Sequence, residues 1–462
     1  MSTLAAPPTT DPIPDLRAAV EGVVAGPGEP GYDRAVPWRL DVEVSPSAVV
    51  LATSGDDVSA TMRVAAAHGL TVAVASTGHG ALPIDESSIL VHTASLTGCV
   101  IDPETRTARV GAGVRWQQVI DLAAVHGLAP VVGSAPDVGV IGFLTGAGVG
   151  PLVRSVGLAC DRVRSFDLVT GTGEQLHVTP AARPDLFAGL CGGKGTLGIV
   201  TSVEIDLLPI AEIYGGALYF DGSDSAAVLR AWRRWTADLS DDVTTSIAFL
   251  QLPQAPDVPP PLAGRFTVAV RYASVGDPDA AEAELGPMRA VATPVVDTIG
   301  VMPYRDIGAV HSDPVDPMPA HERHTLLSEL TVDAVETMIE VAGAGSGSPQ
   351  AIVELRLLGG EMARGGAADA FCHRGAAYSL LTIGVLVPPV ADAIPAHAAR
   401  VIEAMAPWST GGEFPNFSPA ADPDSLARCY DEETRAWLAA LAEEHDPNGV
   451  LRVGHVVRTP RV

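Results

Sequence analysis

The feature that most constrains this chain is an apolar run of eighteen residues with six glycines, Gly133 to Gly150 (GSAPDVGVIGFLTGAGVG). Glycine has no Cβ, so a segment rich in glycine lets the backbone lie flat against a large ligand. The alternative is a flexible linker, but such linkers are polar and this run is apolar. We therefore expect a structured segment that contacts a ligand.

A second loop of small residues, Ser76 to Gly80 (STGHG), follows a predicted helix over Val58–His68 and a predicted strand over Leu70–Ala75. Small residues allow successive backbone N–H groups to face one point, and such a nest holds a pyrophosphate without a positive side chain. His79 lies inside this loop. The loop alone leaves open whether His79 is a turn residue or a group that acts on the ligand.

The pattern of predicted strands and helices changes along the chain, and this change predicts two domains. From about residue 48 to residue 210, short runs of Val, Ile and Leu alternate with amphipathic stretches, one of which is the predicted helix over Val114–His126. This pattern predicts alternating strands and helices. From Gly215 onward, strand-like runs such as Thr245–Leu252 and Phe266–Tyr272 flank proline-rich connectors. This change indicates a second domain.

Two later segments complete this reading. The run Ala351–Leu358 (AIVELRLL) predicts a strand, and it places Glu354 and Arg356 on one face because side chains alternate along a strand. Residues Asp424–His445 predict one closing helix, followed by a turn at 446–449.

Charge and cysteine content exclude several classes of function. The chain has 29 basic and 55 acidic residues and a net charge of −26, which repels nucleic-acid phosphates and anionic membranes. We therefore expect no nucleic-acid partner and no membrane partner, and no apolar run is long enough to span a bilayer. The five cysteines contain no CxxC pair, and residues 1–15 lack the apolar core of a signal peptide. A cytoplasmic location fits these features best.

One glycine motif fits a nucleotide fingerprint but fails in context. Gly193–Gly198 (GKGTLG) matches GxGxxG, yet Ile199–Leu208 after it alternates like a strand, where a Rossmann site needs a helix. Lys194, the only lysine of the chain, does not make a P-loop either. Ala188 and Gly195 stand where that motif needs a glycine and a Ser or Thr.

A histidine pair resembles a metal motif only at first sight. His321 and His324 are three residues apart, whereas HExxH places its histidines four apart on one helical face. We interpret both as exposed histidines near a proline-rich loop. We predict no metal site.

Taken together, these segments resemble the vanillyl-alcohol oxidase superfamily, specifically the berberine-bridge-enzyme-like branch of FAD-linked oxidases. The loop at 76–80 is similar to the family's [S/G]GGH loop, and residues 138–150 are similar to its VGxGGxxxGGGxG segment. Residues 185–201 resemble DLFWALRGGGGNFGIVT, which also explains the false Rossmann match. Near the carboxyl end, Pro415–Phe417, Arg435 and Asp446–Asn448 resemble the YxNF, RL and DPxN elements. The resemblance covers most of the chain in the right order.

The resemblance implies an α+β fold with three parts. Residues 1–212 are expected to form a PCMH-type FAD-binding domain of two subdomains, with its core at about 42–210. Residues 213–405 are expected to form an α+β substrate domain whose antiparallel sheet covers the flavin. Residues 406–462 are expected to return to the FAD-binding domain.

The resemblance also implies FAD as the cofactor and a set of residues that bind it. His79 corresponds to the histidine that many members attach covalently to the flavin. Members with a second tether use a cysteine where this chain has Ala135, so one covalent bond is expected. The expected cofactor-binding residues are Ser76, Thr77, Gly78, His79, Gly80, Ala81, Val138, Gly139, Gly142, Gly146, Gly148, Gly198, Ile199, Val200 and Asn416.

Departures from the family pattern bear on catalysis. The tyrosine of YxN, often a base or its helper, is replaced by Phe414, and Phe143 and Ala147 replace residues that are commonly histidine and glycine. Glu354 is therefore the expected catalytic base, because its strand ends in the family's GG and resembles a strand of the sheet over the flavin. Arg356 is expected to hold an anionic substrate or to stabilise reduced flavin. A structural Glu354–Arg356 pair on a solvated sheet face is the alternative.

The resemblance implies an oxidase that transfers hydride from a small organic molecule to flavin N5, with oxygen as the electron acceptor. A GC-rich bacterial setting favours a substrate from secondary metabolism. The alternatives are a dehydrogenase, a reductase or isomerase of the same fold, and a flavin-binding protein without activity. A monomer or a homodimer is expected.

Overall fold

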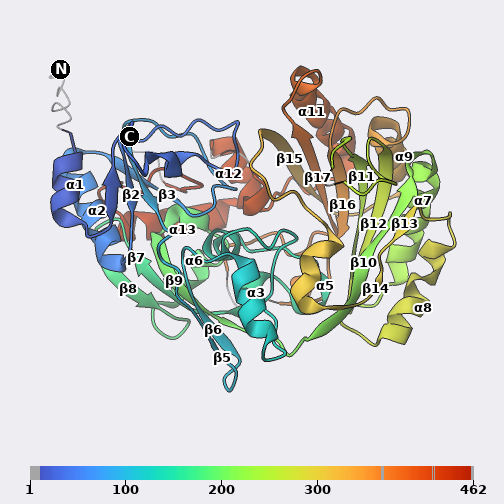
Figure 1. The fold of residues 1–462 in the computed structure, drawn as a ribbon, viewed down its shortest axis with the longest axis horizontal. Helices are drawn as coiled ribbons and strands as arrows, with labels where there is room; N and C mark the ends of the chain where they lie inside the picture. The colour runs from blue at the N-terminus through green and yellow to red at the C-terminus, as the bar shows by residue number, and fades with distance from the viewer. Residues whose placement is uncertain (1–10, 257, 366–368, 419, 421, 459–462) are drawn as a thin grey trace.

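The computed structural model describes residues 11–256, 258–365, 369–418, 420 and 422–458. Their strands form three sheets with helices packed on the sheet faces (Figure 1). This mixture of helices with largely antiparallel sheets confirms the predicted α+β class. No helix in these residues is long and apolar enough to cross a membrane.

The first sheet carries the loop that contains His79. Its strands are β1 (Val23–Ala25), β2 (Ala48–Leu51), β3 (Thr71–Ala75) and β4 (Ser88–His92), in the order β1-β2-β4-β3. Strands β2, β4 and β3 are parallel, and helices α1 (Ile13–Ala19) and α2 (Gly55–His68) pack against them. The predicted helix and strand are thus α2 and β3. Ser54 caps the start of α2, and Gly69 ends it with a φ of +68°, a value that glycine adopts without strain.

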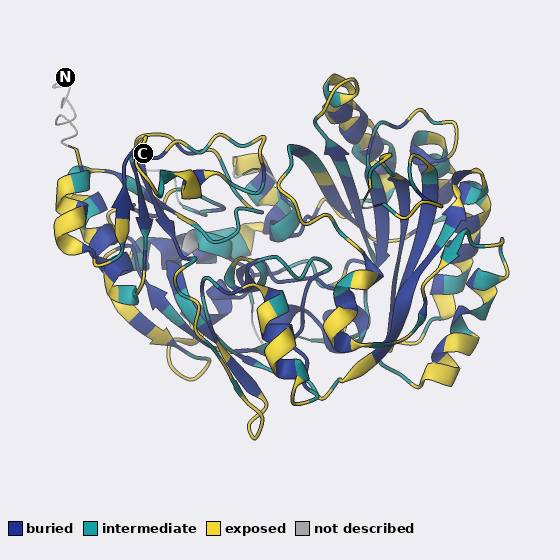
Figure 2. Ribbon diagram, in the orientation of Figure 1, coloured by how far each residue is buried: buried dark blue, intermediate teal, exposed yellow. Residues whose placement is uncertain are grey.

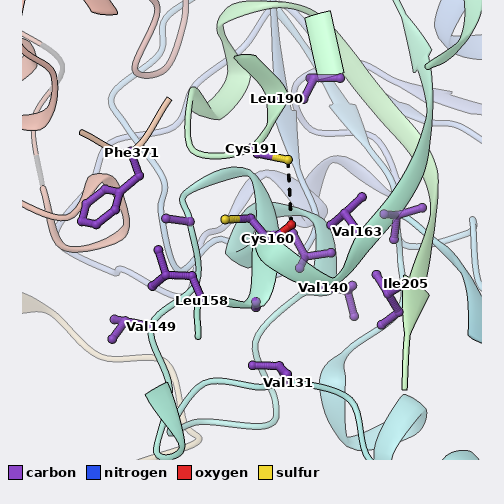
Figure 3. Close-up of a cluster of buried hydrophobic side chains, with 14 of the residues drawn as sticks. Val131, Val140, Val149, Leu158, Cys160, Val163, Leu190, Cys191, Ile205 and Phe371 are labelled. Atoms are coloured by element: carbon purple, nitrogen blue, oxygen red, sulfur yellow. Dashed lines mark hydrogen bonds between the residues drawn. The ribbon is translucent and has the colours of Figure 1, made fainter. Parts of the chain in front are cut away.

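The second sheet is antiparallel and lies beside the second glycine-rich run. Its order is β5-β6-β9-β7-β8, and residues 199–206 form a strand here, as the rejection of the Rossmann motif requires. A large apolar core joins it to helices and loops, and Figure 3 shows part of that core around Cys160 and Cys191. The strands are β5 (Cys99–Asp102), β6 (Thr107–Gly111), β7 (Val163–Val169), β8 (Gln175–Val178) and β9 (Ile199–Asp206), and the helices are α3 (Trp116–Ala124), α4 (Val140–Thr145), α5 (Val153–Val156) and α6 (Pro184–Leu190).

The third sheet has eight antiparallel strands in the order β13-β10-β12-β11-β16-β17-β15, with β14 paired to β10. Its first strand begins at Glu212, so the predicted boundary between residues 212 and 213 falls within it. The strands are β10 (Glu212–Asp221), β11 (Val243–Gln251), β12 (Phe266–Ser274), β13 (Val296–Asp297), β14 (Gly300–Pro303), β15 (Ala320–Leu327), β16 (Ile352–Leu357) and β17 (Tyr378–Val385).

Helices cover one face of this sheet and leave the other face to the rest of the molecule. Val353, Leu355 and Leu357 of β16 point into the core under the helices. Figure 2 shows buried strands and helices whose outer sides are exposed. Glu354 and Arg356 therefore lie on the opposite face, as predicted. The covering helices are α7 (Ser225–Trp235), α8 (Pro278–Arg289), α9 (Val332–Ala342) and α11 (Ile394–Met405).

The last segment contacts the first two sheets. The predicted single closing helix is wrong: it is two helices, α12 (Pro423–Cys429) and α13 (Glu432–His445), because Asp431 between them caps a new helix start by accepting a bond from the Thr434 N–H. Tyr430 donates to the Gly192 carbonyl at 2.8 Å, and the Val72 N–H donates to the Val450 carbonyl at 2.8 Å.

A buried arginine joins the second sheet's helices to the third sheet. Arg154 of α5 donates to the carbonyls of Val243 (2.8 Å) and Leu358 (2.7 Å) and pairs with Asp241 at 3.2 Å. The turn after β16 fits closely against it. A Cβ at Gly360 would lie 2.4 Å from the Arg154 carbonyl oxygen, and Gly360 has a φ of +57°, before the short helix α10 (Glu361–Arg364). The glycine pair after β16 is therefore required by packing against α5.

We expect Arg154→Met to lower the free energy of unfolding by about 3 kcal/mol, because buried carbonyls lose a charged donor. Urea unfolding followed by tryptophan fluorescence measures this loss. The matched control is Arg164→Met, which breaks a half-exposed pair with Asp206 and should cost less than about 1 kcal/mol. Equal losses in the two variants would contradict the role given to Arg154.

Candidate active site

The loop after β3 presents unpaired backbone donors. Among the described residues, none accepts a hydrogen bond from the backbone N–H groups of residues 77–80. Gly78 holds the loop shape, since its φ is +78° and a Cβ there would lie 2.7 Å from Pro37 Cα and from Trp38 N. Consecutive free N–H groups in a glycine turn form an anion-binding nest. The loop therefore fits the pyrophosphate of a dinucleotide, and Ala81 closes it by donating to the Gly78 carbonyl.

His79 is held between an aromatic ring and a carboxylate. Trp38 stacks on it with ring centroids 4.6 Å apart. Its Nε2 lies 3.5 Å from Asp137 Oδ2, and its Nδ1 lies 2.8 Å from Thr77 Oγ1. Asp137 belongs to the second glycine-rich run, so the structure brings the two predicted loops together. Gly139 of that run would place a Cβ 3.2 Å from Ser76 Oγ.

The glycines of the second run differ in what they do. The run is not flat throughout, because its residues 140–145 form helix α4. Gly142 is exposed, with open space where a Cβ would stand, so it is able to face a ligand. Gly148 and Gly150 instead make room for the protein itself: a Cβ at Gly150 would lie 1.8 Å from the Val132 carbonyl oxygen. Val138 uses its carbonyl to bind the Trp116 N–H.

The residues at the start of β9 that were predicted to bind the cofactor pack against the protein itself. Gly198 has a φ of +152°, and a Cβ there would lie 2.7 Å from the Val169 carbonyl oxygen. The Ile199 and Val200 side chains are buried in the cores on either side of the sheet. Only the backbone of these three residues is therefore free to contact a cofactor.

Asn416 lies against the second run. Its Nδ2 donates to the Phe143 carbonyl at 2.9 Å, and its Oδ1 accepts a bond from Lys194 Nζ. A Cβ at Gly146 would lie 2.1 Å from that Oδ1. Segments predicted to bind the cofactor thus meet here, although they are far apart in the sequence.

Glu354 and Arg356 lie in a buried charge cluster. Glu354 accepts from Arg271 Nη1 at 2.9 Å and from Arg356 Nη2 at 3.3 Å, and it lies 3.5 Å from His311 Nε2. Burial raises the pKa of Glu354, but Arg356 and Arg271 outweigh burial and hold it well below its usual value. The predicted alternative of a solvated face is wrong, because Glu354, Arg356 and Arg271 are each at most 5% exposed.

This cluster carries an excess of positive charge. Burial and Arg271 lower the pKa of His311, so the imidazole is neutral, and two arginines face one glutamate. Arg356 Nη1, Arg271 Nε and His311 Nδ1 have no hydrogen-bond partner. The three side chains line a cavity of about 10 Å³, together with Pro151 after the glycine-rich run. Unpartnered donors around a net positive charge favour an electron-rich partner, and a cavity of this size has room for about one water molecule.

Sequence reasoning missed three of these residues. Arg271 and His311 are distant in sequence, and only the strand pairing brings Arg271 beside the predicted pair. Glu322 lies on the same face of β15, pairs with Arg39 at 3.8 Å, and has a pKa raised by burial. The sequence signal that could have identified Glu322 is the alternation of polar residues along its strand.

The interpretation of the histidine pair as exposed residues is wrong. His321 and His324 lie in β15, and His324 is 2% exposed. Its Nε2 is 2.9 Å from Ser379 Oγ, and its ring packs near Phe414 and Phe417. Phe414, at the place of the family tyrosine, is fully buried and stacks on Phe371 at 4.6 Å. This aromatic cluster offers no hydroxyl to a substrate.

We expect Gly78→Ala to lose most bound FAD, because the new Cβ clashes with backbone and the positive φ disfavours alanine. Flavin absorbance per mole of purified protein measures the loss. Gly98→Ala is the matched control, since a Cβ there meets nothing within 4 Å. Full flavin content in Gly78→Ala would contradict the role of this loop.

Comparisons with known proteins agree with this site. A family model described as an FAD-binding domain matches residues 46–179. (R)-6-hydroxynicotine oxidase of Paenarthrobacter nicotinovorans is 29% identical over 303 residues, which cover 64% of this chain and 64% of that relative. The match thus spans less than two thirds of the relative's length.

Two solved structures share the fold of nearly the whole chain. The 6-hydroxy-D-nicotine oxidase of Arthrobacter nicotinovorans has a TM-score of 0.81 at 23% identity and covers 95% of this chain and 98% of that one. Berberine bridge enzyme of Eschscholzia californica has a TM-score of 0.82 at 18% identity, over 98% and 100%. The FAD-binding domain at residues 46–179 confirms the predicted cofactor, and these two structures confirm the predicted fold. Residues 46–179 thus match an FAD-binding domain, and the chain is similar to (R)-6-hydroxynicotine oxidase in sequence and to berberine bridge enzyme in fold.

Proposed function

We propose that the protein is an FAD-dependent oxidase of a small organic molecule from secondary metabolism. The observation that carries this proposal is the buried charge cluster on the third sheet, whose cavity is also lined by Pro151, directly after the second glycine-rich run. Bound FAD supplies hydride acceptance from the substrate and electron transfer to oxygen. The protein's residues then have to bind the cofactor, orient the substrate and take up a proton.

In this proposal residues 1–212 bind FAD, residues 213–405 bind the substrate, and residues 406–462 complete the cofactor site. The loop at 76–81, the glycines at 139, 142, 146 and 148, the backbone at 198–200 and Asn416 contact FAD. All five cysteines are free thiols, which suits the reducing cytoplasm. The functional unit is a monomer or a homodimer.

We also propose that His79 forms one covalent bond to the flavin. Its support is geometric: Trp38 fixes the ring plane, and Asp137 Oδ2 and Thr77 Oγ1 lie near its two nitrogens. A ring fixed in this way loses little freedom when it bonds to a cofactor in the adjoining loop. Ala135 leaves no thiol for a second bond.

We expect acid precipitation of the purified protein to leave the yellow colour in the pellet, with an intact mass raised by one FAD. His79→Ala should release the flavin to the supernatant and keep the fold, because only the tether is removed. His126→Ala, which changes a histidine in the turn after α3, is the control. Flavin in the wild-type supernatant would contradict the tether and leave FAD binding intact.

Glu354 and Arg356 are the proposed catalytic residues. Arg356, with a free Nη1, would hold an anionic group of the substrate, and Glu354 would accept the substrate's proton. Because Arg356 and Arg271 hold the pKa of Glu354 well below its usual value, Glu354 is ionised at every working pH but is a weak base. Glu322 on the same face is the rival acceptor, since burial raises its pKa.

We expect Glu354→Gln to slow flavin reduction by a substrate roughly 100-fold, the usual loss when a general base is removed. Stopped-flow absorbance measures the rate, and thermal unfolding checks that the charge cluster still folds. Glu336→Gln, on an exposed helix pair with Arg230, is the control.

The pH profile separates the two acceptors. With Glu354 as the base, the rate does not fall between about pH 8 and 5, because a lowered pKa keeps it deprotonated there. With Glu322 as the base, the rate falls as acid protonates a carboxylate of raised pKa. A loss of rate in Glu322→Gln and none in Glu354→Gln would overturn the assignment.

The alternatives differ in how the flavin is reoxidised. An oxidase consumes oxygen once the flavin is reduced, whereas a dehydrogenase, reductase or isomerase of the same fold does so slowly. The replacement of the family tyrosine by Phe414 keeps an inactive flavin-binding protein as an alternative. An oxygen electrode separates the oxidase from the others when the protein is reduced with dithionite, freed of excess dithionite under anaerobic conditions and then mixed into aerated buffer.

A further inference from the structure

Lys194, the only lysine of the chain, lies where the predicted cofactor segments meet. It begins the short 3₁₀ turn η3 (Lys194–Thr196) between α6 and β9. Its Nζ donates to Asn416 Oδ1 and approaches the Gly142 carbonyl oxygen at 3.4 Å. Gly142 and Asn416 belong to the second glycine-rich run and the C-terminal segment, so the amine bridges two parts of the FAD site.

The backbone at Lys194 is in a conformation that glycine adopts more easily. Its φ is +56°, in the left-handed region. A residue with a side chain is rare there, because its Cβ strains the backbone. Because the flanking residues are Gly193 and Gly195, a third glycine would fit this turn without strain. A lysine at this position calls for a role for its side chain.

The Lys194 amine has no acidic partner in the described part of the chain, since no ion pair there includes it. Both of its contacts are neutral oxygens. Partial burial lowers the pKa of Lys194 to about 8, so the amine carries its charge at neutral pH, and no described side chain balances that charge. A cation that loses part of its hydration is stabilised by an anion nearby.

The titratable groups around Lys194 do not supply that anion. Burial raises the pKa of Cys429, at the end of α12, to about 12, so this thiol is protonated. Burial and then Lys194 itself lower the pKa of His455, in the C-terminal segment, to about 4, so this imidazole is neutral. Neither α4 nor the turn at Asn416 places a charged side chain against it. In the part of the chain that the structure describes, no side chain therefore supplies a negative charge to this amine.

We propose that Lys194 is a cofactor-binding residue whose ammonium group balances a negative charge of bound FAD. This inference rests on FAD binding by the site and does not depend on which substrate is oxidised. FAD offers two negative charges of this kind, the pyrophosphate and the ring system when it is reduced. In either case the Lys194 side chain supplies a positive charge. The glycine loops offer only backbone N–H groups and do not supply one.

The first test measures FAD binding and the flavin midpoint potential in Lys194→Met and Lys194→Arg. Both variants are made together with His79→Ala, so that the flavin exchanges freely. We expect Lys194→Met to bind FAD roughly tenfold more weakly and Lys194→Arg to bind within about twofold of the parent, because a single charge-assisted hydrogen bond is lost or kept. Arg305→Met, which removes an exposed charge, is the control and should change nothing.

The two measurements together identify which negative charge of FAD Lys194 balances. Weaker FAD binding with an unchanged potential places Lys194 at the pyrophosphate. Unchanged binding with a lowered potential places it at the reduced ring. No change in either quantity overturns the proposal while FAD binding stands. A parent protein that holds no FAD overturns the cofactor site and this inference with it.

The second test uses the fact that the chain has one lysine. Reductive methylation with ¹³C-formaldehyde gives one lysine signal in NMR, identified by its absence in Lys194→Arg. We expect this signal to titrate near pH 8 without flavin and at higher pH with FAD bound, because a nearby anion favours the charged amine. FAD affinity of the parent should fall as pH rises through that range, whereas Lys194→Arg should keep its affinity. A titration unmoved by FAD would contradict the proposal.

Discussion

The site depends on how closely helix α5 fits against the third sheet. Arg154 is inserted between the strands' carbonyls, and Gly360 lets the chain after β16 touch the α5 backbone. A charged donor that satisfies several buried carbonyls is stable only in one arrangement, because any shift leaves polar groups unpaired. The packing of α5 against the third sheet therefore fixes the position of the sheet face that carries Glu354 and Arg356. That position is fixed relative to the second glycine-rich run, which ends just before α5.

The two carboxylates on that sheet face have different electrostatic surroundings. These surroundings move their pKa values in opposite directions: paired arginines lower that of Glu354, and burial raises that of Glu322. Carboxylates whose pKa values are separated in this way differ in the pH range over which they are ionised and able to accept a proton. The cluster around Glu354 keeps one positive charge in excess, although the chain as a whole is strongly acidic. A local field of this sign would draw an anionic substrate against the overall repulsion.

Local patterns predicted what depends on local physics. The helix before Gly69 and the strand after it followed from periodicity and a glycine stop, and the loop at 76–80 followed from its composition. The pair Glu354 and Arg356 followed from strand alternation. The break between α12 and α13 was not predicted, because the alternating apolar residues continue through it and only the capping by Asp431 divides them. Arg271 and His311 reach Glu354 through strand pairing and a loop, and no spacing in the sequence reports such contacts. The burial of His324 likewise depends on Phe414, ninety residues away.

The glycines show why a motif alone does not define a site. Gly150 and Gly198 are required because the chain's own carbonyls occupy the space of a Cβ, whereas Gly142 borders open space. A sequence pattern counts these residues alike, but only at the second kind is the space of a Cβ free of the protein's own atoms. The turn at Gly193–Gly195 adds the reverse case, a position where glycine would fit better than the residue present. Because that residue is also the only lysine and its amine has no counter-charge among the described residues, strain and electrostatics point to the same group. Two independent costs at one side chain indicate a function that offsets both, which is why we propose such a function at the adjoining FAD site.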